Sequence, residues 1–343
     1  AGSFCVSEVR EMIRTIACST QDDAPDKHMM MSRPSMKAAR RLSTATLPPS
    51  PLSSYLSATA SSSSLRTGFT HNFALSSNID RSAAAAFRQR CRDGSFSGQT
   101  SGVAPGFVQA NFVALPLANA FDFLTFCLRN PRACPLLDVT TPNHPYPLTV
   151  APSADLRTDL PKYRLWSYGD VMSEVDQVSD VWTSSMVGFL LGCSFSWEQA
   201  LHEAGHTPRQ IEMGCNCAMY KTNIRNATAG PFGGSLVVSM RPYKASQLKE
   251  VEAITGRYPG AHGAPIHWGD PSALGVSEEQ VRDGMPDFGD KVEVRDDEYP
   301  VFWACGVTPQ AALIEAKLPF AVTHSPGHML VTDLRDEELE VDS

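Results

Sequence analysis

The chain has 343 residues, of which 42% are hydrophobic and 19% charged, a composition typical of a globular protein with one large or two medium domains. Its net charge is -8 and it has no basic stripe interleaved with aromatic residues, so we expect no nucleic-acid partner. The longest apolar run, around 186–195, is too short to cross a membrane, which predicts no membrane partner. Nine scattered cysteines predict reduced, mostly buried thiols rather than a disulfide framework.

Residues 1–77 are predicted to form a disordered leader. No acidic residue occurs from residue 27 to residue 79, a stretch that is rich in Ser, Thr and Ala and carries several basic residues. This pattern is typical of an organellar transit peptide, here residues 27–77, and predicts a protein of the mitochondrial matrix. A generic disordered Ser/Pro-rich linker is the alternative interpretation.

Five helices are predicted from apolar periodicity, caps and Gly or Pro stops, at residues 83–92, 118–129, 181–191, 197–204 and 244–255. Strands are predicted at residues 236–240, 301–304, 320–323 and 329–332. Interleaved helices and strands favour an α/β or mixed α+β protein with helices packed on a sheet. The Pro-rich residues 142–152 indicate an internal boundary, and residues 336–343 are predicted to be a solvated acidic tail.

The most informative segment is a predicted strand-to-helix junction at residues 301–310. An apolar run ends at Cys305 and Gly306, Thr308 is a favourable N-cap, and Pro309 suits the first helical turn. Backbone N–H groups at such a helix start form an anion site, to which Gly306 and Thr308 would contribute. The same positive helix end is expected to lower the pKa of Cys305.

Two pairs of histidines are candidate catalytic groups. His324 and His328 lie on a predicted turn after the junction, and His262 and His267 lie in a Gly/Pro-rich segment. A divalent metal bound by His262 and His267, with Asp270 or the His324/His328 pair completing the coordination shell, is a less favoured alternative. A further alternative is that these imidazoles only hydrogen-bond loop backbone.

A third pair of histidines matches the zinc-protease pattern H-E-x-x-H, from His202 to His206. That chemistry needs both imidazoles on one continuous helix. Gly205 is expected to end the helix before the second histidine, and Thr207-Pro208 prevents its continuation. We therefore predict a helix C-terminus with surface histidines and no zinc site.

Two arginines are equally favoured partners for a substrate carboxylate. Arg157 lies in a dense polar cluster at residues 155–161, and Arg241 follows the strand predicted at 236–240. An arginine fork can hold a carboxylate with two parallel hydrogen bonds. The cluster around Arg157 has an alternative interpretation as a capped turn with local ion pairs.

A series of longer motifs runs in order along residues 78–335. They are Gly102-Val-Ala-Pro-Gly-Phe-Val-Gln-Ala-Asn111, Cys134-Pro-Leu-Leu-Asp138, Asp155-Leu-Arg-Thr-Asp-Leu-Pro161, Gly192-Cys-Ser-Phe-Ser-Trp-Glu198, Met219-Tyr-Lys-Thr-Asn223, His262-Gly-Ala-Pro265, Phe302-Trp-Ala-Cys-Gly-Val-Thr-Pro-Gln310 and Thr323-His-Ser-Pro-Gly-His-Met329. Through these motifs the chain resembles the hydro-lyase family that includes mitochondrial D-glutamate cyclase.

The resemblance implies a three-layer αβα sandwich with a smaller two-layer α/β sandwich domain, which we expect within about residues 142–235. It also implies a lyase that converts D-glutamate into 5-oxo-D-proline and water. The motifs supply four further substrate-binding candidates, Asn111, Tyr220, Asn223 and Gln310.

Cyclising glutamate requires a base for the ammonium, neutralisation of the attacked carboxylate, and an acid for the leaving oxygen. The base would be His324 or His328, and the acid His262 or His267. The helix start at Gly306 would stabilise the oxyanion, while a thioester on the junction thiol is less favoured.

The expected partner is a small acidic amino acid, no cofactor is predicted apart from the divalent-metal alternative, and a homo-oligomer is allowed. Two alternative functions stay open. One is a hydro-lyase acting on another small amino or hydroxy acid, and the other is a non-catalytic carboxylate-binding protein that would tolerate loss of the histidines.

Overall fold

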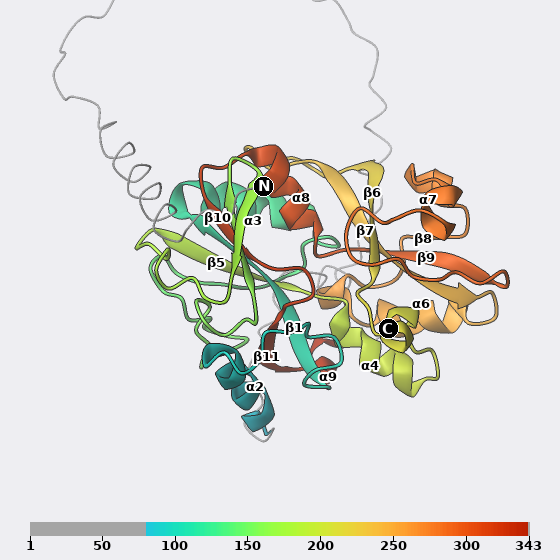
Figure 1. Cartoon of the computed structure of the whole chain (residues 1–343), viewed down its shortest axis with the longest axis horizontal. Coiled ribbons are helices and arrows are strands. Elements are labelled where there is room, and N and C mark those ends of the chain that lie inside the picture. Colours follow the sequence, from blue (N-terminus) through green and yellow to red (C-terminus); the bar gives the residue numbers. More distant parts are fainter. Residues whose placement is uncertain (1–79, 342–343) are drawn as a thin grey trace, which may run out of the picture. The chain divides into compact units, whose positions relative to one another are not determined.

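Two antiparallel sheets form the framework of residues 80–341, the range that this computed structural model describes (Figure 1). The strands are β1 (Phe107–Pro116), β2 (Leu136–Val139), β3 (Tyr163–Ser167), β4 (Asp170–Val175), β5 (Met186–Gly192), β6 (Ala218–Arg225), β7 (Ser235–Lys244), β8 (His267–Trp268), β9 (Glu298–Ala304), β10 (Ala321–His324) and β11 (Leu330–Arg335). The helices are α2 (Ser82–Arg92), α3 (Leu117–Arg129), α4 (Phe195–Glu203), α5 (Arg209–Met213), α6 (Leu248–Gly256), α7 (Glu278–Arg282), α8 (Thr308–Ala316) and α9 (Asp336–Leu339), with 3-10 turns η2 (Pro259–Ala261) and η3 (Pro271–Leu274).

Strand β1 is the centre of the larger sheet, whose order is β2-β5-β1-β10-β3-β4. β5 pairs with one edge of β1, and β10 and β11 pair with the other edge. Phe112 and Ala114 face a core that includes side chains of α4 and α6, whereas Val113 and Leu115 face a core that includes side chains of α3 and α8. Both faces of β1 are therefore buried.

The smaller sheet has the order β6-β7-β9-β8. Tyr243 of β7 and Trp303 of β9 belong to the same hydrophobic core as β1, so the two sheets share one core. A separate core on the smaller sheet contains Tyr220 of β6 together with Leu274 of η3 and Val281 of α7. Trp197 and Leu201 of α4 belong to this shared core as well, so α4 packs against residues of both sheets.

The structure confirms a mixed α+β protein, with helices α2, α3 and α4 and strands β7, β9, β10 and β11 near their predicted positions. Residues 181–191 were predicted as a helix, but residues 186–192 form strand β5, all of it buried. A short run that is buried on every side has no period that separates a helix from a strand. The helix predicted at 244–255 begins only at Leu248, because β7 continues to Lys244.

The smaller sheet lies further along the chain than expected. Its strands are drawn from residues 218–304, whereas the smaller subdomain was predicted within about 142–235. Strands β3 and β4, which lie inside the predicted range, pair with the larger sheet instead.

Residues 336–341 are not the solvated tail that their charge suggested. Asp336 to Leu339 form helix α9, and Leu339 is only 3% exposed in the shared core. Glu338 pairs with Arg81 at 3.1 Å, and Glu340 pairs with Arg257. A segment rich in acidic residues can thus form a short packed helix when an apolar residue of that helix is buried, although its composition predicts a solvated tail.

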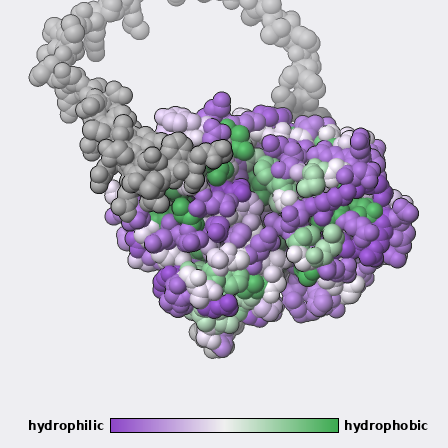
Figure 2. All heavy atoms as spheres, viewed as in Figure 1, coloured by the Kyte–Doolittle hydropathy of each residue, from purple (hydrophilic) through white to green (hydrophobic). Residues whose placement is uncertain are grey.

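The predicted leader and transit peptide lie outside the described residues, so the mitochondrial location stays a prediction. Within residues 80–341, every helix falls short of the length and apolar character that crossing a membrane requires. On the face drawn in Figure 2, hydrophilic residues cover most of the surface and apolar residues appear in separate small groups.

Candidate active site

A buried ion pair joins the smaller sheet to α4. Arg241 of β7 donates from Nη2 to Glu198 Oε1 at 2.9 Å and to Ser194 Oγ at 3.0 Å, while its Nη1 donates to Ser239 Oγ at 3.1 Å. Arg241 is 0% exposed and Glu198 is 4% exposed. Burial raises the pKa of Glu198, and the Arg241 charge opposes this rise. Arg241, predicted as a carboxylate clamp, is therefore already paired with a carboxylate of the protein.

Two tryptophans enclose this guanidinium. The Arg241 Cζ lies 4.5 Å from the ring centroid of Trp197 and 5.6 Å from that of Trp303. Trp197 Nε1 donates to the carbonyl of Ala261 at 2.8 Å, which fixes one ring over the cation. Aromatic faces attract a cation most strongly where water is excluded. The aromatic pair therefore helps to hold a charge that burial alone would disfavour.

The predicted strand-to-helix junction is present between β9 and α8, with Pro309 in the first turn of the helix. Thr308 is not the N-cap. Its Oγ1 accepts from the Val237 N–H at 3.1 Å and donates to the Val237 carbonyl at 3.3 Å. The cap prediction was wrong because the hydroxyl group ties α8 to the neighbouring strand β7.

The thiol of Cys305 differs from its prediction as well. Burial raises its pKa to about 11, although the Val307 N–H and the Arg241 charge both act to lower it. The predicted activation was wrong because the cost of removing a thiolate from water exceeds the stabilisation from the helix start. At neutral pH Cys305 is a neutral, buried thiol.

Several motif residues do come together around this junction. Asn111 of β1 donates from Nδ2 to the Gly192 carbonyl at 2.7 Å, and a side chain on Gly306 would collide with the Asn111 amide. Gln310 of α8 donates from Nε2 to the carbonyl of His324 at 3.2 Å. The fold thus brings together predicted residues from β1, from the turn between β9 and α8, from α8 and from β10 in one buried polar cluster.

His324 and His262 are both buried and neutral at pH 7. His324 Nδ1 lies 3.1 Å from the backbone N and O atoms of Phe112, and His262 Nδ1 lies 2.8 Å from the carbonyl of Arg132. Burial lowers the pKa of each imidazole to about 4. His262 therefore carries no extra proton to donate at neutral pH, which argues against its predicted role as the acid.

His267 and His328 each hold loop backbone. His267 Nε2 lies 2.7 Å from the carbonyl of Asp270, and His328 Nδ1 lies 2.9 Å from the carbonyl of Pro326. Both are half-buried. These contacts correspond to the alternative interpretation, in which the imidazoles support loops.

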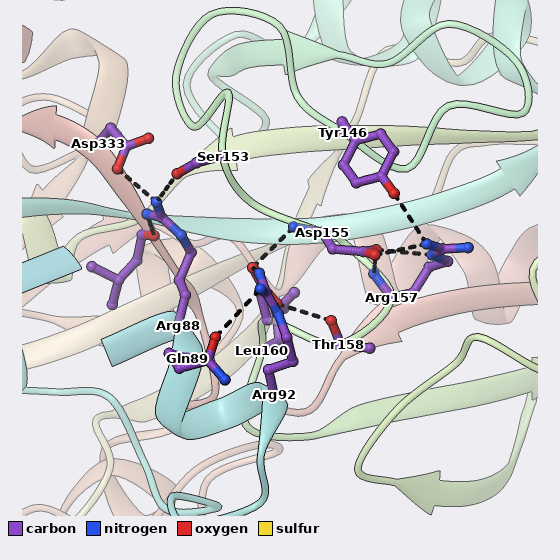
Figure 3. A network of polar contacts seen from close by, with 12 residues as sticks. Arg88, Gln89, Arg92, Tyr146, Ser153, Asp155, Arg157, Thr158, Leu160 and Asp333 are labelled. Carbon is purple, nitrogen blue, oxygen red and sulfur yellow. Dashed lines mark hydrogen bonds and ion pairs between the residues drawn. The ribbon is translucent and has the colours of Figure 1, made fainter. Parts of the chain in front are cut away.

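Arg157 belongs to a local network of ion pairs (Figure 3). Its Nε and Nη2 donate to the two carboxylate oxygens of Asp155 at 2.9 and 2.7 Å, and Nη2 also donates to Tyr146 at 3.3 Å. The guanidinium is therefore held by its own turn, as the alternative interpretation predicted. Tyr220 lies in the apolar core of the smaller sheet, and Asn223 is exposed on the same strand.

The H-E-x-x-H segment has the predicted break. α4 ends at Glu203, and Gly205 adopts a left-handed φ of 80°. His206 is nevertheless not a surface residue, because it is 9% exposed with Nδ1 at 3.0 Å from Gln247. Among residues 80–341, no group of three or more His, Cys, Asp or Glu side chains is arranged to hold a metal ion.

A pocket of about 200 Å³ opens beside α4. It is lined by residues 102–107 and by Gln109, Phe195, Glu198, Gln199, His202, Ile211 and Asp336. This volume exceeds the space of one or two waters and suits a small molecule. Glu198 therefore belongs both to the pocket wall and to the buried pair with Arg241.

Other buried acceptors in this wall have no hydrogen-bond partner within residues 80–341. Gln109 is fixed by hydrogen bonds from Nε2 to the carbonyls of Thr100 and Val103, at 2.8 and 3.2 Å. Its Oε1 is buried, and so is Oδ1 of Asp336, and neither atom has a hydrogen-bond partner among the described residues. Buried acceptors of this kind are normally satisfied by a protein group, a water or a ligand.

Comparison with known proteins identifies the family. The model of a family described as D-glutamate cyclase matches residues 187–333. A "putative hydro-lyase" of Rubrobacter xylanophilus is 52% identical over 258 residues, which cover 75% of this chain and 98% of that protein. The chain belongs to the hydro-lyase family. Two further proteins named "putative hydro-lyase", one from Geobacillus kaustophilus and YcsI from Bacillus subtilis, are 52% and 51% identical. Each match covers 74% of this chain, and 95% and 97% of the respective relatives.

As a member of this family, the hydro-lyase is an enzyme that eliminates water from its substrate. Sequence reasoning did not nominate Glu198, Gln109 or Asp336 as functional residues. Two signals were available, since Gln109 and Glu198 lie inside motifs that carried the family resemblance. Asp336 lies outside those motifs, in an acidic stretch whose composition is typical of a solvated tail, so the sequence did not indicate a functional role for it.

We expect Cys305 of the native hydro-lyase to resist alkylation by iodoacetamide at pH 7.5, because its thiol is buried and its pKa is raised to about 11. Cys215, which is partly exposed, is the internal comparison and should be labelled first. Peptide mass spectrometry after timed labelling measures both rates. Equal rates at the two cysteines would show that Cys305 is an accessible, activated thiol.

Proposed function

We propose that this hydro-lyase cyclises D-glutamate to 5-oxo-D-proline with loss of water. The family model that matches residues 187–333 supports this reaction by its description. The observation that carries the proposal is the placement of Glu198. The Glu198 carboxylate lines a pocket large enough for a small molecule while the interior guanidinium of Arg241 holds that carboxylate in position.

Glu198 is suited to act as the base. The amino group of glutamate must lose a proton before its nitrogen can attack the side-chain carboxyl carbon. Glu198 Oε1 accepts from Arg241 and from Gln210 Nε2, at 2.9 and 2.7 Å, while Oε2 accepts from Ser101 Oγ at 3.3 Å. Burial raises the pKa of Glu198, which brings its proton affinity closer to that of an amine.

The pocket also suits the substrate's positive group. Gln109 Oε1 and the Glu198 carboxylate are acceptors in the wall, and an ammonium carries three donors. A cation lies close to the wall as well, because a side chain on Gly106 would collide with the guanidinium of Arg335. Arg335 does not line the pocket itself, because its guanidinium lies 4.4 Å from the Phe107 ring and 3.7 Å from Glu337, but its charge attracts a substrate carboxylate toward this side of the pocket. In this arrangement the substrate is folded with its amine toward Glu198, which favours ring closure.

Turnover tests the proposal directly. The protein is incubated with D-glutamate and, separately, with L-glutamate and small hydroxy acids, and loss of one water is followed by mass spectrometry. We expect a product from D-glutamate. Absence of a product from D-glutamate, with turnover of another acid, would favour the alternative of a hydro-lyase for a different small acid.

Glu198→Gln should reduce kcat by about 10²- to 10⁴-fold, because the amide accepts hydrogen bonds but takes no proton. Glu198→Asp keeps the charge that Arg241 needs and withdraws the carboxylate from the pocket, so it should fold normally and still lose most activity. Glu279→Gln, the same change at an exposed position of α7 that does not line the pocket, is the control and should keep wild-type kcat. A folded Glu198→Asp protein with wild-type kcat would remove Glu198 from the mechanism.

A further inference from the structure

Asp336 places a second carboxyl group in the pocket wall. It opens helix α9 and its side chain is 8% exposed, yet Oδ1 has no hydrogen-bond partner among the described residues. Its backbone N–H donates to the carbonyl of Gly106 at 3.1 Å, which fixes α9 against the loop at the pocket mouth. Asp336 therefore combines a place in the pocket lining with a buried carboxyl oxygen that has no hydrogen-bond partner among the described residues, and such an oxygen is normally satisfied by a water or a ligand.

Helix α9 holds this carboxyl group in a fixed place. Leu339 anchors the helix in the shared core, and Glu338 accepts from the Arg335 N–H at 2.8 Å. Glu338 also pairs with Arg81, at 3.1 Å, next to the start of the described chain. Support from a buried side chain and from two arginines is more than a surface turn needs, and it positions the one pocket residue that α9 contributes.

We propose that Asp336 is a catalytic acid of this hydro-lyase. It protonates the side-chain carboxylate of the substrate, which the amine then attacks, with Glu198 as the base, to form the amide of the ring. This inference rests on the proposed cyclisation and adds its second proton-transfer group. A carboxylate is a poor electrophile, so its charge must be neutralised before an amine can attack. An acid side chain at the pocket wall performs that step without a metal or a cofactor.

The proton transfers balance between the two carboxyl groups. Asp336 gives its proton to the substrate carboxylate and Glu198 takes one from the ammonium. The nitrogen then forms the C–N bond, and the tetrahedral carbon carries a hydroxyl and an oxyanion. The nitrogen returns a second proton to Asp336, Glu198 gives its proton to the hydroxyl, and the C–O bond breaks to release water. Both side chains recover their starting states.

The surroundings of Asp336 favour its protonated form. The charged and titratable groups around it are Arg335 and Glu337 on its own segment, Glu203 on α4, Tyr258 next to η2, and Glu198 and His202 in the pocket wall. Burial is the main cause that raises the pKa of Asp336 to about 8, and Glu337 and Glu203 act in the same direction against Arg335. Asp336 is therefore a proton donor at pH 7.

The test compares Asp336→Asn with the same change at Asp283, an exposed residue at the end of α7 that does not line the pocket. We expect Asp336→Asn to lower kcat on D-glutamate at least a hundredfold, while Asp283→Asn stays within twofold of the wild type. The wild-type kcat should fall above pH 8 as the acid loses its proton, and this alkaline limb should disappear from the residual activity of Asp336→Asn.

Stability separates a catalytic role from a structural one. A raised pKa in the folded state means that the wild type loses stability as pH rises from about 4 to about 8, whereas Asn has no charge to bury. Asp336→Asn should therefore melt no lower than the wild type at pH 8. If the wild type and Asp336→Asn are equally active, this inference is wrong and the proposed function still stands. The same holds if Asp336→Asn is inactive only because it unfolds. A wild type inactive on D-glutamate would overturn the proposed function instead.

Discussion

Replacing Arg241 with Met is expected to lower the free energy of unfolding by about 3–5 kcal/mol, because the substitution leaves the Glu198 carboxylate buried without its cation. The effect should be larger at pH 8 than at pH 5. Once the guanidinium is gone, burial raises the folded-state pKa of Glu198 above its unfolded value, so a proton can relieve the penalty only as pH falls. Urea unfolding at both pH values measures the difference.

Two comparison proteins make the result specific to the buried pair. Arg164→Met removes an ion pair with Glu174 whose side chains are 26% and 41% exposed, and it should cost about 1 kcal/mol or less. In the double variant Arg241→Met/Glu198→Met both charges are absent, and most of the stability should return. If Arg241→Met costs no more than Arg164→Met, the interior pair does not determine stability as argued here.

Replacing Gly192 with Ala should cost about 3 kcal/mol or more, or prevent folding. Gly192 ends β5, and a Cβ at this position would collide with the carbonyl oxygen of Gly260 in η2. The clash is with a backbone atom, which cannot be relieved by a change of rotamer as a clash with a flexible side chain can. The Gly192 carbonyl also accepts from Asn111 Nδ2, so any shift of this strand end disturbs the polar group at the junction as well.

Gly256→Ala is the matched control for this prediction. Gly256 lies in α6, and its added Cβ would meet only Ala264 Cβ, at an ordinary 3.7 Å. This variant should be stabilised by about 0.5–1 kcal/mol, because Ala has less conformational freedom to lose in a helix. Thermal melting of both variants tests the pair. Equal and small changes would mean that η2 and β5 are not in close contact.

Local signals predicted the parts of the fold that local forces determine. Helices α2 and α3 have apolar faces at helical spacing and clear stops at Gly94 and Asn130, and both occur as expected. Strand β1 went unpredicted and β5 was predicted as a helix because both are buried on two faces. A strand in that position has no alternation between polar and apolar residues, so only its neighbours decide what it forms.

In the candidate site too, some features follow from local sequence and others only from tertiary packing. The sequence alone predicted three features. They are the motifs that place the chain in its family, the break in the H-E-x-x-H segment, and the junction between β9 and α8. What the tertiary structure decided is the environment of each group. The fold buries Cys305 and His262, pairs Arg241 with Glu198, and brings Asp336, from the acidic stretch at 336–342, to the pocket wall. Proton affinity depends on burial and on charges distant in sequence, so residue types and spacing identify the chemical groups, and only the fold assigns their protonation states and partners.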